Sequence, residues 1–500
     1  MPRISIMRAL LPLACLAVAL PSLAATYVVP TDETLIRKAG LIVRGQVLDV
    51  APVEDPDGSI HTEITLEVAR SLKGGAPGRT VVIRQPGGAI GDRIDVYPGI
   101  GSFAPGEEVI VMLDPIQGSA FRLTDYALGK FHVGYRSDGT SYLRRDGLGD
   151  AHVLQTAASP SIAGGAVDPD RDAAAFERFI VETVRGARPE ADYVVAPGTA
   201  AAEGAEDVHA EFEFLGTPPA RWIEFDTGGT VTIRDNSKGD AGSHCPTGCH
   251  GEVAGGLNAW NFASGAGISL LYGGTDGTMR RTCLIDLRNQ VQFNDPCNEI
   301  TDLSGCSGAL ALGGYSAYST GGGTKCPERG NVDFGHVIAG RILVNNGVGS
   351  CLNTCNYRDM IAHETGHILG ADHSNVSGAL MGPYLANGRC GALQGDDVDF
   401  AVCAYAGTPA PCDPPTITRA YARSVDGILR AVVLGTGFSS GDRVEIDSGG
   451  GFVAAKRTVL KSSVKILGMN VKSIWPKAVP VQVRVVTPAG CASSAISAVR

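Results

Sequence analysis

The 500-residue sequence predicts a multidomain protein with a small β domain on the N-terminal side, a central α+β domain and a C-terminal β-sandwich. A chain of this length exceeds one hydrophobic core, and its 44% hydrophobic and 19% charged residues are typical of folded domains rather than of disorder. The 66 glycines and the aromatic content of 6% favour short strands and many turns over helical bundles. We therefore expect strands and long loops to dominate the fold.

The first 24 residues have the pattern of an export signal. Arg3 and Arg8 precede an apolar run that ends at Leu20, and Ser22-Leu23-Ala24 supplies the small residues that precede a cleavage site. The run is shorter than the roughly 20 apolar residues that cross a bilayer, so a membrane anchor is the less favoured interpretation. We expect removal of residues 1–24 and a secreted or periplasmic protein without a membrane span.

The cysteines are consistent with an oxidising compartment. Of the 13 cysteines, twelve follow residue 24, and all twelve lie between Cys245 and Cys491, so that six disulfides can form. The segment from His244 to His250 can also be drawn as a second zinc site, but export favours disulfides. Cys412 and Cys491 lie near the ends of the last domain and are candidates for one bridge, although the sequence does not establish the pairing.

Residues 25–155 have the pattern of a small β domain. Ile64, Leu66 and Val68 alternate with polar residues. Val109 to Leu113 is a short apolar run, and Gly and Pro residues separate such segments. We expect a barrel-like sheet in this part of the chain.

Residues 156–207 are predicted to contain one helix and a linker. Asp168 is suited to the N-cap and Pro169 to the first helical position, and the helix should end near Gly186. Residues 187–207, rich in Ala, Pro, Gly and Glu, indicate a linker or an exposed strap. We interpret the apolar stripe of this helix as a core face; it consists of Phe176, Phe179, Ile180 and Val184.

Residues 208–408 are predicted to form the α+β domain. Strand-like segments and a helix-like segment occur there between long, cysteine-rich loops. The strand-like segments are Trp222 to Arg234, Ile268 to Tyr272 and Ile342 to Asn345, and the helix-like segment is Glu252 to Phe262.

Residues 409–500 begin with a Pro-rich junction, Pro409 to Pro415, and then carry about seven short apolar runs, a pattern typical of a β-sandwich. From Asp413 to Arg500 there are 12 basic and 5 acidic residues, which we interpret as a solvated basic surface; the alternative is contact with an acidic polymer or a cell surface. The net charge of the whole chain, -10, argues against nucleic acid as a partner. One run alternates at Val479, Val481, Val483 and Val485.

The chemistry is concentrated in a segment that begins at His363 and reads His-Glu-Thr-Gly-His-Ile-Leu-Gly-Ala-Asp-His-Ser. If Arg358 to Leu369 is helical, His363 and His367 lie one turn apart on one face, where both imidazoles can bind one cation. Gly370 can adopt the left-handed conformation that ends a helix, which lets His373 reach the same ion. Three neutral imidazoles suit Zn²⁺ and leave a fourth position for water.

Glu364 is the candidate general base. It follows the first histidine, and its carboxylate can take a proton from zinc-bound water and pass it to a leaving amine. These parts fit peptide-bond hydrolysis best. The alternative is a buried helix with merely hydrogen-bonded histidines, and it does not explain why two His and one Glu cluster on an otherwise apolar helix.

This segment resembles the signature of the metzincin zinc peptidases, His-Glu-x-x-His-x-x-Gly-x-x-His followed by a methionine turn. Ala379-Leu380-Met381, followed by Pro383-Tyr384, is similar to that turn. The resemblance implies that Met381 lies beneath the metal and that Pro383 and Tyr384 line the pocket for the residue after the scissile bond. Tyr384 is one position too late to match the metal-binding tyrosine of some branches. Ser374, directly after the third histidine, resembles the matrixin branch.

The resemblance to matrixins covers about 200 of the 500 residues. Trp222 to Arg234 and Gly255 to Trp260 are similar to the first strand and helix of a matrixin domain, and Leu393 to Gly407 to its last helix. It implies a mixed twisted sheet, one catalytic Zn²⁺ and, by family resemblance alone, Ca²⁺. The sequence departs from the family in having no complete calcium loop and no matrixin-style structural zinc motif. Latency through a propeptide thiolate is impossible, because no cysteine lies between residue 24 and Cys245.

The last domain resembles the immunoglobulin-like IPT/TIG domains in two short segments, Pro414 to Ile417 and Gly435 to Phe438. We therefore expect an Ig-like fold for residues 409–500.

The leading hypothesis is a secreted zinc endopeptidase that acts on proteins or peptides. Its substrate is expected to add as a strand to an exposed sheet edge within Leu310 to Asn345. The role of the N-terminal β domain has three alternatives: a propeptide, an inhibitor in cis or a targeting module. The rival hypothesis is a secreted binding or adhesion protein with a vestigial peptidase unit.

Overall fold

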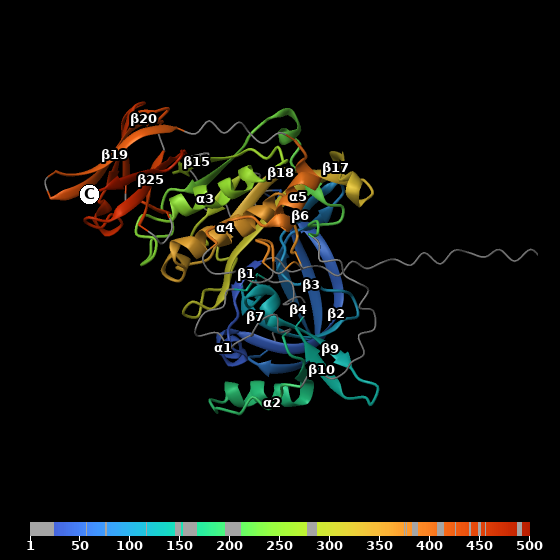
Figure 1. Ribbon diagram of the computed structural model, residues 1–500. Helices are drawn as coiled ribbons and strands as arrows, with labels where there is room; N and C mark the ends of the chain where they lie inside the picture. The colour runs from blue at the N-terminus through green and yellow to red at the C-terminus, as the bar shows by residue number, and fades with distance from the viewer. Residues whose placement is uncertain are drawn as a thin grey trace, which may run out of the picture.

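A computed structural model of the chain describes residues 25–145, 152–153, 168–195, 212–277, 288–382, 389–407, 415–487 and 493–500, apart from residues 57, 76, 77, 117, 375, 377, 426, 440, 441, 449–451 and 456 within these ranges. Its elements are described below as an N-terminal region (25–195), a central region (212–407) and a C-terminal region (415–500), which Figure 1 shows in blue to teal, green to orange, and red. Among the described residues, no helix is both long and apolar enough to cross a membrane.

The N-terminal region is built on an eight-stranded sheet. Its strands are β2 (Leu41–Glu54), β3 (Ile60–Lys73), β4 (Thr80–Pro86), β7 (Glu108–Pro115), β8 (Phe121–Leu123), β9 (Lys130–Tyr135), β10 (Ser141–Arg144) and β12 (Arg171–Asp172). Their order is β12-β10-β9-β7-β2-β3-β4-β8, and β8 also pairs with β7, which closes five strands into a ring. Ile64 and Leu66 are buried within it and Val68 is partly buried, as their alternation predicts. The predicted barrel-like sheet is confirmed.

The helix predicted after Asp168 forms, but it begins later than expected. It is α2 (Ala173–Val184), and its N-cap is Asp172, which accepts a hydrogen bond from a backbone N–H of the first turn at 2.8 Å. The prediction of Asp168 as the N-cap is wrong because its carboxylate forms ion pairs with two buried arginines. The apolar stripe is buried at three of its four positions, while Val184 is 41% exposed. A shorter helix, α1 (Asp32–Lys38), lies near α2 at the lower end of the molecule in Figure 1.

The central region contains a mixed sheet. Its own strands are β13 (Ala220–Arg221), β14 (Val231–Asn236), β15 (Leu270–Asp276), β16 (Gln290–Gln292), β17 (Gly308–Lys325) and β18 (Val332–Val344). β15, β14, β16 and β18 are parallel, and β17 is antiparallel to β18. The continuous strand predicted from Trp222 to Arg234 is wrong, because a 3-10 turn at Glu224–Thr227 and the left-handed Gly228 (φ 73°) separate β13 from β14.

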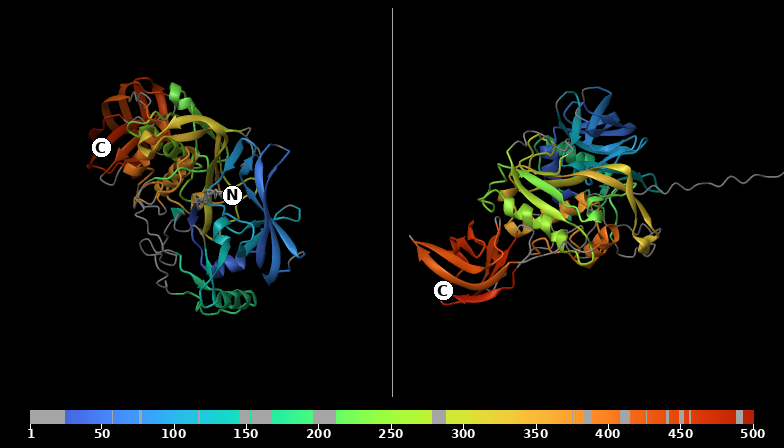
Figure 2. Two further views of the ribbon diagram at one scale, coloured as in Figure 1. Left: turned by 90° about the vertical axis from the view of Figure 1, so that its right-hand side faces the viewer. Right: turned by 90° about the horizontal axis from the view of Figure 1, so that it is seen from above.

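Strands of the N-terminal region extend this central sheet. They are β1 (Ala25–Val28), β5 (Gly88–Ile90), β6 (Arg93–Val96) and β11 (His152–Val153). The path runs β11-β1-β17-β18-β16-β14-β15, and β6 also pairs with β17. Accordingly, the blue strands β1 and β6 lie beside the yellow central strands in Figure 1, and the two regions remain adjacent in both views of Figure 2.

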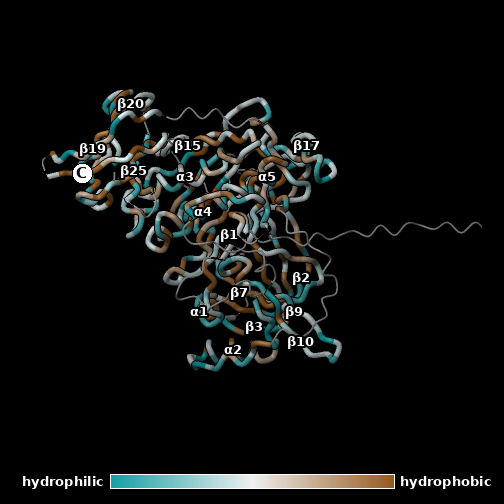
Figure 3. The backbone as a smooth tube through the Cα atoms, in the orientation of Figure 1, coloured by the Kyte–Doolittle hydropathy of each residue, from teal (hydrophilic) through white to brown (hydrophobic). Residues whose placement is uncertain are grey.

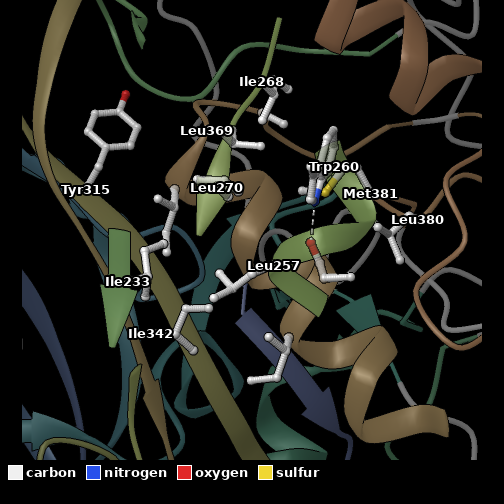
Figure 4. Close-up of a cluster of buried hydrophobic side chains, with 14 of the residues drawn as sticks. Ile233, Leu257, Trp260, Ile268, Leu270, Tyr315, Ile342, Leu369, Leu380 and Met381 are labelled. Carbon is white, nitrogen blue, oxygen red and sulfur yellow. Dashed lines mark hydrogen bonds between the residues drawn. The ribbon is translucent and has the colours of Figure 1, made fainter. Parts of the chain in front are cut away.

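Three helices pack against the central sheet: α3 (His250–Ala259), α4 (Thr354–Ile368) and α5 (Gly395–Tyr405). All three agree with the predicted helices except at their ends. α3 approaches α4 closely, since a Cβ on Gly256 would lie 2.6 Å from Ile361 Cγ2. The indole Nε1 of Trp260 donates to Ala362 O at 2.8 Å, within the buried cluster of Figure 4.

The C-terminal region consists of two four-stranded antiparallel sheets. Their orders are β19-β20-β24-β23 and β22-β21-β25-β26. The strands are β19 (Thr416–Val425), β20 (Ile428–Thr436), β21 (Arg443–Asp447), β22 (Phe452–Ala454), β23 (Arg457–Ser462), β24 (Lys465–Met469), β25 (Pro480–Val486) and β26 (Ile496–Val499). Both sheets contribute to one apolar cluster around the fully buried Trp475. Val481, Val483 and Val485 face it, but Val479 precedes β25 and is 39% exposed. The IPT/TIG resemblance remains a prediction.

Hydropathy along the backbone follows this burial pattern. The apolar run of β7 is brown in Figure 3; Val109, Val111 and Leu113 face the barrel cluster, and Ile110 and Met112 belong to a second buried cluster.

Four disulfides join described residues, as an oxidising compartment predicts. They are Cys245–Cys249, Cys306–Cys351, Cys326–Cys403 and Cys355–Cys390. The first takes up both cysteines of the alternative zinc site. Cys412 and Cys491, the predicted bridge of the last domain, lie outside the described residues.

Candidate metal centre

The candidate metal ligands are carried by α4 and the turn that follows it. The helix starts after Asn353, whose side chain accepts a hydrogen bond from Asn356 N at 2.9 Å. The last two turns carry His363 and His367, and both imidazoles are fully buried. The predicted spacing therefore places two candidate ligands on one helix face, within the protein interior.

Gly370 ends α4 and redirects the chain. Its φ is 92°, and a Cβ at this position would lie 2.3 Å from Ala220 O. Only glycine meets both conditions without a shift of β13. The turn brings His373 back against the helix, where it is 4% exposed.

The three imidazoles converge on one point. Their ligand nitrogens lie within 4.8 Å of one another. His363 Nε2 lies 2.9 Å from His367 Nε2 and 3.1 Å from His373 Nε2. The other ring nitrogens of the two helical residues are occupied: His363 Nδ1 lies 2.9 Å from Leu380 O, and His367 Nδ1 lies 2.8 Å from Ala371 O.

The contacts of the two Nδ1 atoms determine the tautomers of His363 and His367, and the tautomers decide whether the site can bind a metal. A carbonyl only accepts hydrogen bonds, so each of the two Nδ1 atoms must donate, and the Nε2 of each neutral imidazole then carries a lone pair instead of a proton. Burial lowers the pKa of His363 to about 4 and moves the pKa of His367 well below its ordinary value, so both rings are neutral near pH 7. Two lone pairs 2.9 Å apart repel unless a cation binds both. The donor set suits Zn²⁺.

Met381 lies beneath this helix. It is 1% exposed, and its carbonyl accepts a hydrogen bond from Ser374 N at 2.8 Å, which closes the turn after His373. Figure 4 shows Met381 beside Trp260 in the same buried cluster. Pro383 and Tyr384, predicted to line a substrate pocket, lie outside the described residues.

Gly366→Ala is predicted to destabilise the protein by about 1–3 kcal/mol through overpacking. A Cβ at Gly366 would lie 2.2 Å from Met381 Sδ and 2.8 Å from Trp260 Cζ2. Urea unfolding measures the loss. The matched control is Gly251→Ala in α3, where no atom lies within 4 Å of the added Cβ; it should leave stability unchanged or raise it. Equal effects of the two substitutions would contradict the packing argument.

Asp397 orients the methionine turn, a role that the sequence analysis did not assign. Its carboxylate accepts hydrogen bonds from Leu380 N at 2.8 Å and Met381 N at 2.9 Å. Leu380 O in turn accepts the Nδ1–H of His363. A buried carboxylate on α5 thus positions the carbonyl that fixes the first candidate ligand.

Asp397→Asn is predicted to weaken zinc binding roughly 10- to 100-fold, the usual effect of losing support behind a metal ligand. The amide cannot accept both backbone N–H groups, because one of its two terminal atoms is a donor. Competition against a chromophoric chelator measures the affinity. Asp399→Asn, exposed on the same helix, is the control and should bind zinc like the native chain. Equal zinc affinities in the Asp397→Asn and Asp399→Asn chains would show that Asp397 does not support the metal ligand.

Glu364 lies beside the histidines on α4 and is fully buried. Burial raises the pKa of its carboxyl to about 7. Hydrogen bonds from Thr26 and Gly313 lower the pKa, but their effect is smaller than that of burial. Glu364 Oε1 accepts hydrogen bonds from Thr26 N at 3.1 Å and Thr26 Oγ1 at 2.7 Å. The candidate base is therefore in contact with β1, a strand of the N-terminal region. Nothing in the sequence near Glu364 indicates this partner.

A cavity of about 650 Å³ borders the third histidine. Asp372 and His373 line it from the central region, and residues 97–103 line it from the N-terminal region. The space beside the candidate metal centre is thus enclosed by both regions.

The sheet edge expected to receive a substrate is β17, but it is not exposed as predicted. β1 and β6 pair with it along the side that faces away from β18. The correction follows from long-range strand pairing, which hydrophobic patterns within Leu310 to Asn345 do not reveal.

Two polar groups outside the candidate metal centre, His336 and Asp55, have contacts within the fold. His336 lies within β18, with Nε2 3.9 Å from Glu224 Oε1. The carboxylate of Asp55, in a segment that can be drawn as a calcium loop, contacts His61 Nδ1 at 3.1 Å and forms an ion pair with Arg84. The contacts of Asp55 agree with a turn rather than a calcium site.

Comparison with known families agrees with this geometry. Residues 224–406 match the model of the matrixin peptidase family. They form a matrixin-like metzincin domain, and matrixins are zinc-dependent metallopeptidases. A search of curated proteins found no significant match for the chain.

Proposed function

We propose that this protein is an exported zinc endopeptidase whose ion is bound by His363, His367 and His373. The observation that carries the proposal is the pair of Nε2 atoms 2.9 Å apart, with both Nδ1 atoms within hydrogen-bond distance of backbone carbonyl oxygens. The matrixin match over residues 224–406 supports the same class of chemistry and a peptide substrate.

The chain contributes one acid–base group. Bound zinc would lower the pKa of a coordinated water and polarise the substrate carbonyl. Glu364 would take the proton of the attacking water on its carboxylate and return it to the leaving amine. Burial raises the pKa of this carboxyl above its ordinary value, which is the direction that favours a proton acceptor near neutral pH. Met381 and Gly370 would support the ligand geometry, and Pro383 and Tyr384 would line the pocket after the scissile bond.

Export and domain organisation are part of the proposal. The disulfides agree with an extracellular or periplasmic protein, and residues 1–24 would be the removed signal. The C-terminal region would be an IPT/TIG-like module whose basic surface is solvated or contacts an acidic polymer. Calcium binding remains an expectation from the family resemblance.

Metal analysis and a peptide library test the function. The purified chain should contain one zinc per molecule, and cleavage of library peptides should stop on chelation and return with added zinc. The Thr26→Pro chain described below is assayed in parallel. Zinc-loaded protein that cleaves no peptide in either form would favour the rival, a secreted binding or adhesion protein with a vestigial peptidase unit.

A further inference from the structure

The edge of β17 is paired with N-terminal strands over most of the segment that passes the metal centre. β1 pairs antiparallel with Gly308 to Leu312, and β6 pairs antiparallel with Tyr315 to Tyr318. An extended peptide binds a sheet edge through the same backbone N–H and C=O groups. A substrate strand and the N-terminal strands therefore cannot occupy this edge together.

The short interval between the two pairings lies against Glu364. A Cβ on Gly313 would lie 2.7 Å from Glu364 Oε2, and a Cβ on Gly314 would lie 2.2 Å from Val96 O of β6. Glycine at both positions lets the carboxylate and the N-terminal backbone approach β17 from its two faces. The edge thus runs directly past the proposed base.

Thr26 of β1 binds that base. Its backbone N–H and its hydroxyl both donate to Glu364 Oε1, at 3.1 and 2.7 Å, and Thr26 is 0% exposed. Thr26 thereby occupies one of the two carboxylate oxygens of Glu364 and holds the side chain against β1. β1 therefore combines occupation of the edge with a direct contact to the proposed base.

β1 is held firmly in this position. Ala25 and Tyr27 are also fully buried, and Tyr27 OH donates to Gly99 O at 2.5 Å. The carboxylate of Asp125 in the N-terminal region accepts Ala309 N of β17 at 3.3 Å and binds Lys38 Nζ at 2.8 Å. One apolar cluster spans both regions and includes Tyr27, Tyr97, Ala309, Leu312 and Leu343.

We propose that the N-terminal region is an inhibitor in cis, in which β1 occupies the place of a substrate strand on β17 and Thr26 binds Glu364. This regulation rests on the proposed peptidase function. It needs no thiolate, since the chain has no cysteine between residue 24 and Cys245. The peptidase becomes active when β1 leaves the edge or is removed by proteolysis.

Substitutions at Thr26 in the full chain test the inhibition. Thr26→Pro removes the hydroxyl and the N–H, and it disrupts pairing of β1 with β17. We expect kcat/KM for a fluorogenic peptide to rise at least tenfold. Thr26→Ala removes only the hydroxyl bond and should give a smaller rise, about threefold; it keeps the test valid if the proline variant fails to fold.

The matched controls are Thr31→Pro and Thr31→Ala. Thr31 lies a few residues after β1, is exposed, and has φ -66°, which a proline ring accepts; both controls remove its cap on α1, a hydrogen bond from Thr34 N at 3.2 Å. Neither control should change turnover. Equal kcat/KM in the native, Thr26 and Thr31 chains, with zinc bound in each, would overturn the inhibitor proposal and leave the peptidase proposal intact.

Binding of a peptidyl hydroxamate, a probe that ligates zinc, separates the two proposals. If no chain cleaves peptide, the peptidase proposal fails, and hydroxamate affinity still reports on the edge. At least tenfold tighter binding to the Thr26→Pro chain than to the Thr31→Pro chain supports occupation of the edge by β1. Equal affinities would refute it. Absence of zinc from every chain would contradict both proposals.

Discussion

Glu364→Gln is expected to reduce peptide cleavage about 10²- to 10⁴-fold while zinc stays bound, since this is the usual contribution of a general acid–base group. Glutamine has nearly the same volume, and its carbonyl oxygen can still accept hydrogen bonds from Thr26. It cannot take a proton from water near pH 7. The loss should therefore appear in kcat rather than in folding or metal content.

The comparison is made in the native chain and in the Thr26→Pro chain, because the N-terminal region would otherwise mask the difference. Zinc content and thermal unfolding are measured beside turnover. Glu33→Gln is the control; it removes one exposed ion pair with Arg37 and should leave turnover unchanged. Full turnover in the Glu364→Gln chain would remove this residue from the mechanism.

Sequence patterns identified the candidate ligands because the necessary geometry is local. His363 and His367 are one helical turn apart, and Gly370 allows the return to His373, so spacing alone brings three imidazoles together. The supporting groups could not be found in this way. Thr26 lies 338 residues before Glu364 in the chain, and only the pairing of β1 with β17 brings them together.

The same distinction applies to the fold. Alternation at Ile64 and Leu66 predicted the barrel because it reports which side of a strand is buried. It does not report which strands become neighbours, so it does not predict that β1 and β6 join the central sheet. The residue type of Asp168 predicts a helix start, but buried arginines form ion pairs with its carboxylate, and the helix starts at Ala173.

Removal of the metal is expected to destabilise the central region by several kcal/mol. A ligand that binds only the folded state stabilises it by about 4 kcal/mol at a thousandfold excess over its Kd. Without a cation, the Nε2 lone pairs of His363 and His367 also face each other at 2.9 Å in a buried site. For about 200 residues, a loss of this size lowers Tm by roughly 10 °C.

Calorimetry with and without a chelator measures this shift, and His367→Ala should reproduce it in zinc-containing buffer because two imidazoles bind the ion weakly. His336→Ala is the matched control: this histidine lies on β18 with its side chain 26% exposed, away from the three candidate ligands. It should retain both zinc and the response to chelation. If chelation of a zinc-loaded chain leaves Tm unchanged, the ion adds nothing to folding stability. That result would contradict a buried metal site formed by α4 and the turn after it.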